Sequence, residues 1–365
     1  MRTPLAGPSV WSGEQMAQRT DWIEALEDAE VAELMHAVKQ VADSGLSWLE
    51  LNKAHFALPL LSRRLARVAH ALEHGAGFVT LRNLPVEQLD ATSAMVALWG
   101  IGLHLGTAVS QSRYGELLGE VRDYGEQLGQ SSSRGYRTGV SLRFHTDRCD
   151  LVALLCVRQC RSGGESRIAS TPFLHNQLLQ QSPQALELLF DDWFHSRQGE
   201  QGPGELPYYR NPIFAVFNER FTSQYSRSYI ESAQQFPEVP GLTAAHVDAL
   251  DQVIAAADRD CFQTRMQPGD LQLLNNHLTW HARTTIDDFD APQKKRMLYR
   301  LWLSSPLSRT LPTGFAELWG ATHCGAVRGG VVSGEGYRTA DELLALKREG
   351  KVSGRSGWPL EALPA

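Results

Sequence analysis

The chain has little of what marks a disulfide scaffold, a nucleic-acid-binding protein or a membrane protein. Its 365 residues include five cysteines, an odd number, and no C-x-x-C pair, which disfavours both a disulfide framework and a cysteine-based zinc site. The formal net charge is −6 and no long basic block occurs, so binding of a nucleic acid is not expected. The longest apolar run, residues 151–157, is too short to span a bilayer, and the N-terminus has no apolar signal-peptide core. These absences predict a soluble, cytoplasmic protein with no nucleic-acid or membrane partner.

What remains is a globular composition whose pattern changes near residue 75. Before that point, apolar residues recur at three- and four-residue steps over 14–41 and 60–72, which predicts helices. Short strand candidates separated by turns then dominate. Their ranges are 77–82, 115–122, 139–144, 151–157, 166–169, 213–217, 262–266, 271–274 and 296–303, with helices expected at 91–102, 173–190 and 243–257. Many short strands joined by turns favour a sandwich, barrel or jelly roll.

One short motif has the residue types of a metal site. His145-Thr146-Asp147 closes the strand candidate 139–144, and side chains two residues apart on a strand point to the same side. An imidazole and a carboxylate together suit a divalent metal of intermediate hardness. A second H-x-D copy, His246 to Asp248, falls on an amphipathic helix, where residues two apart do not face each other. We interpret that copy as part of a solvated helix face.

A facial metal site needs a third ligand from a distant part of the chain. His281 is the best-placed histidine, because it follows the buried-looking run 270–276 and belongs to another short strand candidate. His277, in the turn before it, is the main competitor. A hydrogen-bonded core histidine is the alternative interpretation of His281.

The last strand candidate has an unusual face. Within the alternating stretch 294–303, residues 296–303 place two arginines and a tryptophan on one side of the strand, and only apolar and tyrosine side chains on the other. The first side carries Arg296, Leu298, Arg300 and Trp302. Because a guanidinium matches a carboxylate with two parallel hydrogen bonds, this face predicts a cavity that holds an anion. The alternative is a solvated face whose arginine stems pack on Trp302.

Taken in chain order, these motifs resemble the taurine dioxygenase (TauD/TfdA-like) superfamily of Fe(II)/2-oxoglutarate-dependent oxygenases, which includes the γ-butyrobetaine hydroxylase-like enzymes. The resemblance covers roughly residues 75–305. Its pieces are residues 77–85, residues 106–111, His145-Thr146-Asp147, the Gly-Gly-Glu-Ser stretch 163–166, Asn275-Asn276 before His281, and Arg296 and Arg300 ahead of residues 301–303. It implies a mainly β fold with helical additions. A double-stranded β-helix (jelly-roll) core at 76–310 would follow a helical N-terminal region at 1–75 packed on it, with a C-terminal extension at 311–365.

Carried over residue by residue, the resemblance implies that His145, Asp147 and His281 hold Fe(II). The open coordination positions would take 2-oxoglutarate and then O2. The enzyme would hydroxylate, desaturate or cyclise an unactivated C–H bond of a small molecule, while 2-oxoglutarate becomes succinate and CO2. Related halogenases have a small residue in place of this aspartate, so Asp147 favours hydroxylation over halogenation.

The resemblance also implies a cosubstrate site. Arg296 would grip the distal carboxylate of 2-oxoglutarate, and Ser166, where relatives often carry threonine, would donate its hydroxyl to it. Arg300 would assist the cosubstrate or hold an anionic group of the substrate, and we rank the first role slightly ahead. Phe144 and Ala282 stand where tryptophan and glycine are common, and both should reshape the pocket without removing the metal.

Two other functional classes compete with an oxygenase. A jelly-roll metallo-hydrolase would use a metal-bound water as nucleophile, but it gives Arg296 and Ser166 no role. A non-catalytic metal-binding module would keep the fold and the ligands alone. Dependence of activity on 2-oxoglutarate separates the first alternative from the oxygenase, and failure to bind Fe(II) would favour the second.

The substrate contacts are the least defined part of the sequence. Lids usually select the substrate on such scaffolds, and the polar stretch 126–139 is our candidate lid. Within it, Tyr136 and Arg137 could clasp a polar or anionic small molecule. The other candidates for facing the pocket are Gln111, Tyr114 and Arg143. A homo-oligomer is compatible with the sequence, with the N-terminal region as a subunit contact.

Overall fold

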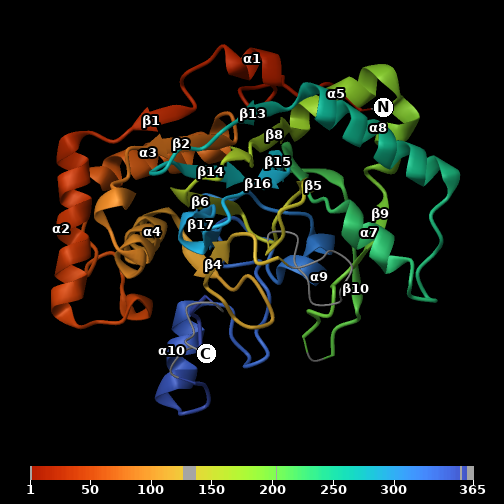
Figure 1. The fold of residues 1–365 in the computed structure, drawn as a ribbon. Helices are drawn as coiled ribbons and strands as arrows, with labels where there is room; N and C mark the ends of the chain where they lie inside the picture. The colour runs from red at the N-terminus through yellow and green to blue at the C-terminus, as the bar shows by residue number, and fades with distance from the viewer. Residues whose placement is uncertain (1, 126–136, 203, 354–355, 360–365) are drawn as a thin grey trace.

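Two β-sheets stacked face to face form the centre of the molecule (Figure 1). The structure is a computed structural model and describes residues 2–125, 137–202, 204–353 and 356–359. The larger sheet has the order β1-β2-β14-β6-β17-β3, with β4 also paired to β17, and the smaller sheet has the order β13-β8-β15-β5. The larger sheet consists of β1 (Ile23–Ala25), β2 (Phe78–Arg82), β3 (Thr107–Val109), β4 (Leu118–Val121), β6 (Leu151–Arg158), β14 (Leu271–Asn275) and β17 (Met297–Ser304). The smaller consists of β5 (Leu142–His145), β8 (Ser166–Ser170), β13 (Phe262–Thr264) and β15 (Thr279–Arg283). This architecture confirms the predicted jelly-roll core with helical additions.

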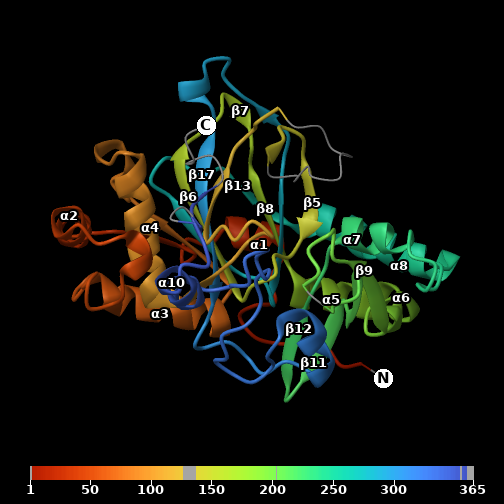
Figure 2. The ribbon, with the colours of Figure 1, turned by 90° about the horizontal axis from the view of Figure 1, so that it is seen from below.

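Each sheet carries helices on its outer face (Figures 1 and 2). The larger sheet packs against α2 (Asp28–Ser44), α3 (Leu61–His74) and α4 (Ala91–Leu105), and the smaller against α5 (Thr171–Gln181), α6 (Pro183–Leu188) and α8 (Ala244–Asp260). A third apolar cluster, which includes Val152, Ile168 and Trp302, joins the inner faces of the two sheets. The two outer layers keep both sheets dry on their outer sides, so the space between the sheets is where a site can form.

The strands bear out the alternation found in the sequence. Strand β6 lies between β14 and β17, and its apolar side chains are buried on both faces, as its continuous apolar run predicts. In β17, Tyr299, Leu301 and Leu303 pack toward the helices on the outer face of the sheet. The opposite set therefore points between the sheets.

The first 45 residues differ from the expected uninterrupted helix over 14–41. A short α1 (Gly13–Ala17) is followed by β1, which pairs in parallel with β2, and α2 begins only at Asp28. At the N-terminus of α2 the reason is local, because Glu27 and Glu30 form a capping box there and so begin a new helix. Similarly, the helix expected at 173–190 is two helices, because Pro183 begins α6 at the end of α5.

The remaining named elements lie outside the two main sheets and the helices that cover them. They are β7 (Ser162–Gly163) paired with β16 (Ile286–Asp287), the hairpins β9 (Asp192–Ser196) with β10 (Tyr208–Pro212) and β11 (Phe214–Phe217) with β12 (Arg220–Ser223), α7 (Arg227–Ala233), α9 (Ala316–Trp319) and α10 (Ala340–Arg348). Leu343 of α10 belongs to the same core as Trp48, and α10 contacts the short 3-10 turn Trp48–Glu50. The division of the chain at residues 75 and 310 stays a prediction. Within the described part of the chain, no helix combines the length and apolar character needed to cross a membrane.

A buried ion cluster ties α3 to the turn before β15. Glu73 lies 2.9 Å from Arg309 and 2.7 Å from Arg220, and it accepts a 3.0 Å hydrogen bond from the Asn275 side chain. Burial would raise the pKa of Glu73, but the two arginines outweigh it and hold this pKa below its ordinary value of 4.5. The cluster therefore stabilises the fold only while Glu73 is ionised.

Replacing Glu73 with glutamine is expected to lower the free energy of unfolding by about 3–5 kcal/mol, because Arg309 is left buried without its counter-charge. Urea unfolding at neutral pH measures this loss. The difference between wild type and variant should be fully present above pH 4.5, and it should shrink as the pH falls through the lower folded-state pKa. Glu187→Gln, which breaks an exposed pair with Arg2, is the control and should cost less than about 1 kcal/mol. Equal losses in the two variants would contradict the role of Glu73.

Candidate active site

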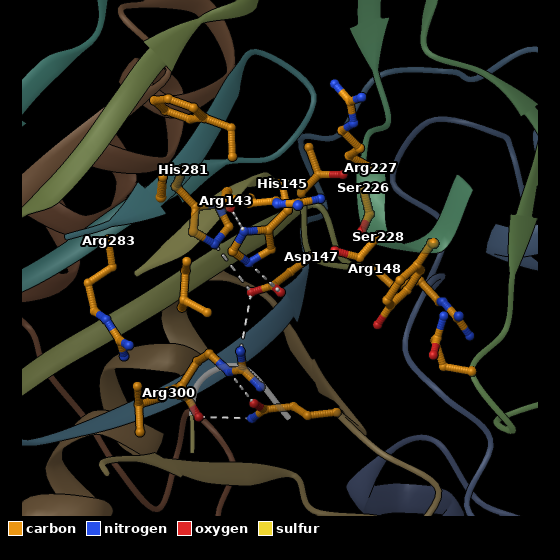
Figure 3. Close-up of a pocket in the computed structure, with 18 of the residues that line it drawn as sticks. Arg143, His145, Asp147, Arg148, Ser226, Arg227, Ser228, His281, Arg283 and Arg300 are labelled. Atoms are coloured by element: carbon orange, nitrogen blue, oxygen red, sulfur yellow. Dashed lines mark hydrogen bonds and ion pairs between the residues drawn. The ribbon is translucent and has the colours of Figure 1, made fainter. Parts of the chain in front are cut away.

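Two neighbouring strands of the smaller sheet bring His145, Asp147 and His281 together between the sheets. His145 ends β5 and lies directly opposite His281 in the antiparallel pair β5–β15, and Asp147 follows two residues after His145. Their ligand atoms all lie within 4.8 Å of one another. Both histidine Nε2 atoms are 3.8 Å from an oxygen of Asp147, and Figure 3 shows the three side chains converging.

The three side chains fit a single divalent metal ion. Ligand atoms in adjacent positions about 2.1 Å from one metal are about 3 Å apart, so the 3.8 Å separations have to close by less than about 1 Å. The His145 Nδ1 donates a 2.9 Å hydrogen bond to the carbonyl of Arg143, which leaves its Nε2 available as the ligand atom.

The protonation states also suit a metal. Burial, with a smaller effect of His145, lowers the pKa of His281 to about 3, so its imidazole is neutral. Burial alone would raise the pKa of Asp147, but Arg300, the two histidines and the Trp302 N–H outweigh it and keep that pKa below its usual value. The Trp302 N–H donates to Asp147 over 2.9 Å. A carboxylate and neutral imidazoles are the forms that bind metal.

The competing histidines have structural roles. The buried His277 places its Nε2 2.8 Å from Asp150 and its Nδ1 2.8 Å from the Thr222 hydroxyl, outside the metal-binding group. His246, in the second H-x-D copy, forms part of the capping box that begins α8. The neighbouring Asn276 accepts the backbone N–H of Asp147 over 3.1 Å, so the turn before β15 fixes the aspartate loop.

A cavity of about 1330 Å³ opens beside the three ligands. The face of β17 that the sequence singled out lines it, with Arg296, Leu298, Arg300 and Trp302. The interpretation of this face as part of a cavity is therefore confirmed, and the solvated alternative is wrong. The two arginines lie four residues apart, which is about 13 Å along a strand.

One end of the cavity holds polar donors that have no partner in the described part of the chain. Arg296 is 4% exposed; its Nε donates to Gln159 over 3.1 Å, whereas its Nη1 is buried and makes no hydrogen bond. Ser166 donates to the Gln272 carbonyl oxygen over 2.6 Å, and the Gln272 amide nitrogen is likewise buried and without a partner. Gly164 has a φ of +68°, and a Cβ at this position would lie 3.1 Å from the Arg296 Nε. A larger residue at position 164 would therefore crowd the Arg296 side chain.

A further arginine lies at the same end. Arg283 follows His281 by two residues in β15 and pairs in register with Ser166 of β8. Its Nη2 donates to the carbonyls of Thr138 and Val140, while Nε and Nη1 are buried and have no partner. Burial, together with the nearby Arg296, lowers the pKa of Arg283 to about 10. Such desolvated donors suit a carboxylate.

Arg300 lies at the other end, beside the ligands. Its Nη1 is 3.6 Å from Asp147, and its Nε donates to the Gln111 side chain over 2.7 Å. Gln111 in turn donates to the Arg300 carbonyl over 2.9 Å, so this predicted pocket residue is buried and holds the arginine in place.

Of the remaining predicted substrate residues in the described part of the chain, one lines the cavity and two do not. Arg143 lines the cavity and forms a 3.0 Å ion pair with Glu231. Tyr114 is 53% exposed and does not line the cavity, which corrects its expected position. Arg137 stacks over the ring of Tyr124 and is not among the lining residues. Tyr136 lies outside the described residues.

The sequence did not predict several residues of the cavity region, among them Arg148, Gln272 and Arg283. Two of these three carried a signal. Arg283 follows His281 at the strand period of two, and Gln272 is the only polar residue of the strand candidate 271–274. Arg148 is next to Asp147, but the chain leaves its strand there and the alternation no longer tells where a side chain points.

Fold and site together define the class. Two histidines and one carboxylate on one face of a metal position, with an open cavity beside them, are the ligand set of mononuclear non-haem iron oxygenases. The buried, unpartnered donors of Arg296 and Gln272 lie in the same region of this jelly roll.

Comparison with known proteins supports the same class, the mononuclear non-haem iron oxygenases. Residues 42–302 match the family described as "Taurine catabolism dioxygenase TauD, TfdA family". The FR-33289 synthase of Streptomyces rubellomurinus is 34% identical over 327 residues, which is 88% of this chain and 96% of the relative. A structure of asparagine oxygenase with Fe(II), 2S,3S-3-hydroxyasparagine and succinate superposes with a TM-score of 0.62 at 20% identity, covering 80% of this chain and 98% of that one. OrfP with Fe and alpha-ketoglutaric acid gives 0.60 at 16%, covering 79% and 96%.

The chain belongs to the TauD/TfdA family of Fe(II)/2-oxoglutarate-dependent oxygenases. The resemblance noted in the sequence, the enzyme class and the predicted cofactors Fe(II), 2-oxoglutarate and O2 are thereby confirmed. Family membership also decides against the metallo-hydrolase and the non-catalytic module.

Proposed function

We propose that this protein hydroxylates an unactivated C–H bond of a small-molecule substrate in the cavity beside His145, Asp147 and His281, with 2-oxoglutarate converted to succinate and CO2. Desaturation and cyclisation are the variants of the same chemistry. The observation that carries the proposal is the joint presence of a facial ligand set and, in the same region, buried donors without partners. The hydroxylated amino acids in the asparagine oxygenase and OrfP structures support a small-molecule substrate.

His145, Asp147 and His281 would hold Fe(II), and the bound iron supplies the oxidising chemistry together with O2 and 2-oxoglutarate. The chain's own task is to fix the ligand geometry and to exclude bulk water. Trp302 does the first by donating to Asp147, and the apolar cluster of Val152, Ile168 and Trp302 between the sheets does the second.

Arg296 would bind the distal carboxylate of 2-oxoglutarate, assisted by Ser166, Gln272 and Arg283. The free Nη1 of Arg296 and the free amide nitrogen of Gln272 are donors that a carboxylate would satisfy. The guanidinium of Arg300 is engaged elsewhere, since its Nη1 lies 3.6 Å from Asp147 and its Nε donates to Gln111. We therefore assign Arg300 to the metal end, where it stabilises the charge of Asp147 and anionic groups brought to the metal.

The expected cytoplasmic location is part of the proposal. All five cysteines are free thiols, which is usual for a protein of a reducing compartment.

An anaerobic titration tests the function. Purified metal-free protein is mixed with Fe(II) and then with 2-oxoglutarate, and the visible absorption is followed. A weak metal-to-ligand charge-transfer band that needs both additions is expected, since the 2-oxo acid would chelate the iron in this site. A screen of small molecules for stimulated succinate formation would follow. Bound Fe(II) with no band on addition of 2-oxoglutarate would refute the proposal.

A further inference from the structure

The cavity contains a buried arginine that the roles proposed above leave unused. Arg148 is 8% exposed and lines the cavity next to the metal ligands. Among the described residues its guanidinium forms no ion pair and no hydrogen bond; its one contact is the ring of Tyr209, 5.9 Å from the guanidinium carbon. The guanidinium therefore faces the cavity without a counter-charge, and such a group favours an anionic ligand.

Three other arginines near Arg148 are paired with carboxylates. Arg143 and Arg227 lie 3.0 Å and 2.7 Å from Glu231. Arg197, which flanks the same Tyr209 ring, is 3.5 Å from Glu205 and donates to the carbonyls of Leu206 and Glu317. Each of these three arginines thus has a carboxylate partner, whereas Arg148 has none among the described residues.

The charge balance of the loaded site points the same way. Fe(II) and Asp147 together carry one positive charge, and the two carboxylates of 2-oxoglutarate change this to one negative charge. The described lining of the cavity contains seven arginines and, besides Asp147, two carboxylates, those of Glu200 and Glu231. A surplus of positive charge remains for the substrate to offset.

The position of Arg148 separates its ligand from the cosubstrate. Figure 3 shows Arg148 and Arg283 on opposite sides of the ligand group, with Ser226 and Ser228 on the Arg148 side. Both serines line the cavity and provide hydroxyl donors. An anion at Arg148 would thus be held near the metal, but away from the donors around Arg296.

The backbone of Arg148 is fixed from the C-terminal part of the chain. The N–H of Gly330 donates to the Arg148 carbonyl over 2.7 Å, and a Cβ on Gly329 would lie 2.6 Å from that same oxygen. Both glycines have positive φ, 75° and 70°, so this close approach requires glycine. Arg148 is therefore placed before any ligand arrives, which reduces the ordering cost of binding.

We propose that Arg148 binds an oxyanion head group of the substrate, a carboxylate, sulfonate or phosphonate, and that it orients the substrate's C–H bond toward the metal. This inference rests on the proposed function, because it takes the cavity to be a substrate site. It adds an anion subsite distinct from both Arg296 and Arg300.

The test uses the protein loaded anaerobically with Fe(II) and 2-oxoglutarate, so that the cosubstrate site is filled. Acetate, methanesulfonate and methylphosphonate serve as probes, and binding is followed by the broadening of each probe's methyl proton signal near the paramagnetic iron. Arg148→Gln should weaken binding of the preferred probe at least tenfold, and Arg148→Lys should weaken it less, since the charge is kept and the planar fork is lost. Arg210→Gln, an exposed arginine outside the cavity, is the matched control and should bind the probe like wild type.

The readouts distinguish the two proposals. Absence of the charge-transfer band in the wild type refutes the proposed function itself. If the band forms but none of the three anions binds, or if Arg148→Gln binds them as wild type does, the subsite is refuted. The band should persist in Arg148→Gln, which also shows that this variant is folded. The probe that binds most tightly identifies the head group: acetate for a planar carboxylate, methanesulfonate for a tetrahedral monoanion, methylphosphonate for a tetrahedral group of higher charge.

Discussion

Replacing Asp147 with alanine is expected to weaken Fe(II) binding at least about 100-fold and to abolish the charge-transfer band and succinate formation. Loss of a group that only supports a metal ligand typically costs 10–100-fold in metal affinity, and loss of a ligand should exceed this. The vacated volume also leaves Arg300 and the Trp302 N–H facing a buried space without the carboxylate they now contact. Metal affinity is measured by anaerobic titration with Fe(II), and turnover by succinate formation.

The chain contains its own control for this experiment. Asp248 belongs to the second H-x-D copy, on the exposed face of α8, and hydrogen-bonds only to Gln252 among the described contacts. Asp248→Ala should leave Fe(II) binding and the band unchanged. Retention of full activity in Asp147→Ala would show that the aspartate is not a ligand.

Arg296→Gln is expected to raise the apparent dissociation constant of 2-oxoglutarate roughly 10–150-fold while Fe(II) binding stays as in wild type. Hydrogen bonds to charged groups contribute about 1.5–3 kcal/mol, and each 1.4 kcal/mol is a factor of ten. The glutamine keeps a polar side chain but cannot neutralise a carboxylate. The intensity of the charge-transfer band as a function of 2-oxoglutarate concentration measures the change.

Pyruvate sharpens this test, because it has the 2-oxo acid that chelates iron but no distal carboxylate. Its weaker binding should be nearly the same in wild type and in Arg296→Gln. A parallel loss of pyruvate binding would mean that Arg296 supports the cavity rather than the carboxylate. Unchanged 2-oxoglutarate affinity would make Arg296 structural.

The sequence alone predicted the parts of the site that depend on local geometry. In β17, the period of two and the chemistry of arginine and tryptophan were enough to predict a cavity-lining face. The same period placed His145 and Asp147 on one side and distinguished them from the copy at His246, because a helix separates residues two apart. Such inferences need only the backbone of a few consecutive residues.

Only the tertiary structure decided between partners distant in the chain. His277 and His281 are similar histidines in sequence, and the β5–β15 register is what sets His281 opposite His145 while Asp150 engages His277. Residues 23–25, which the sequence predicted to be helical, form strand β1 because they pair with β2. Likewise, Arg148 lies in a turn between strands, and no local pattern shows that its guanidinium enters the cavity without a carboxylate. The sequence determined the chemistry available to this protein, because residue types and strand alternation are local. The fold determined which groups meet, because burial and charge pairing depend on contacts between segments far apart in the chain.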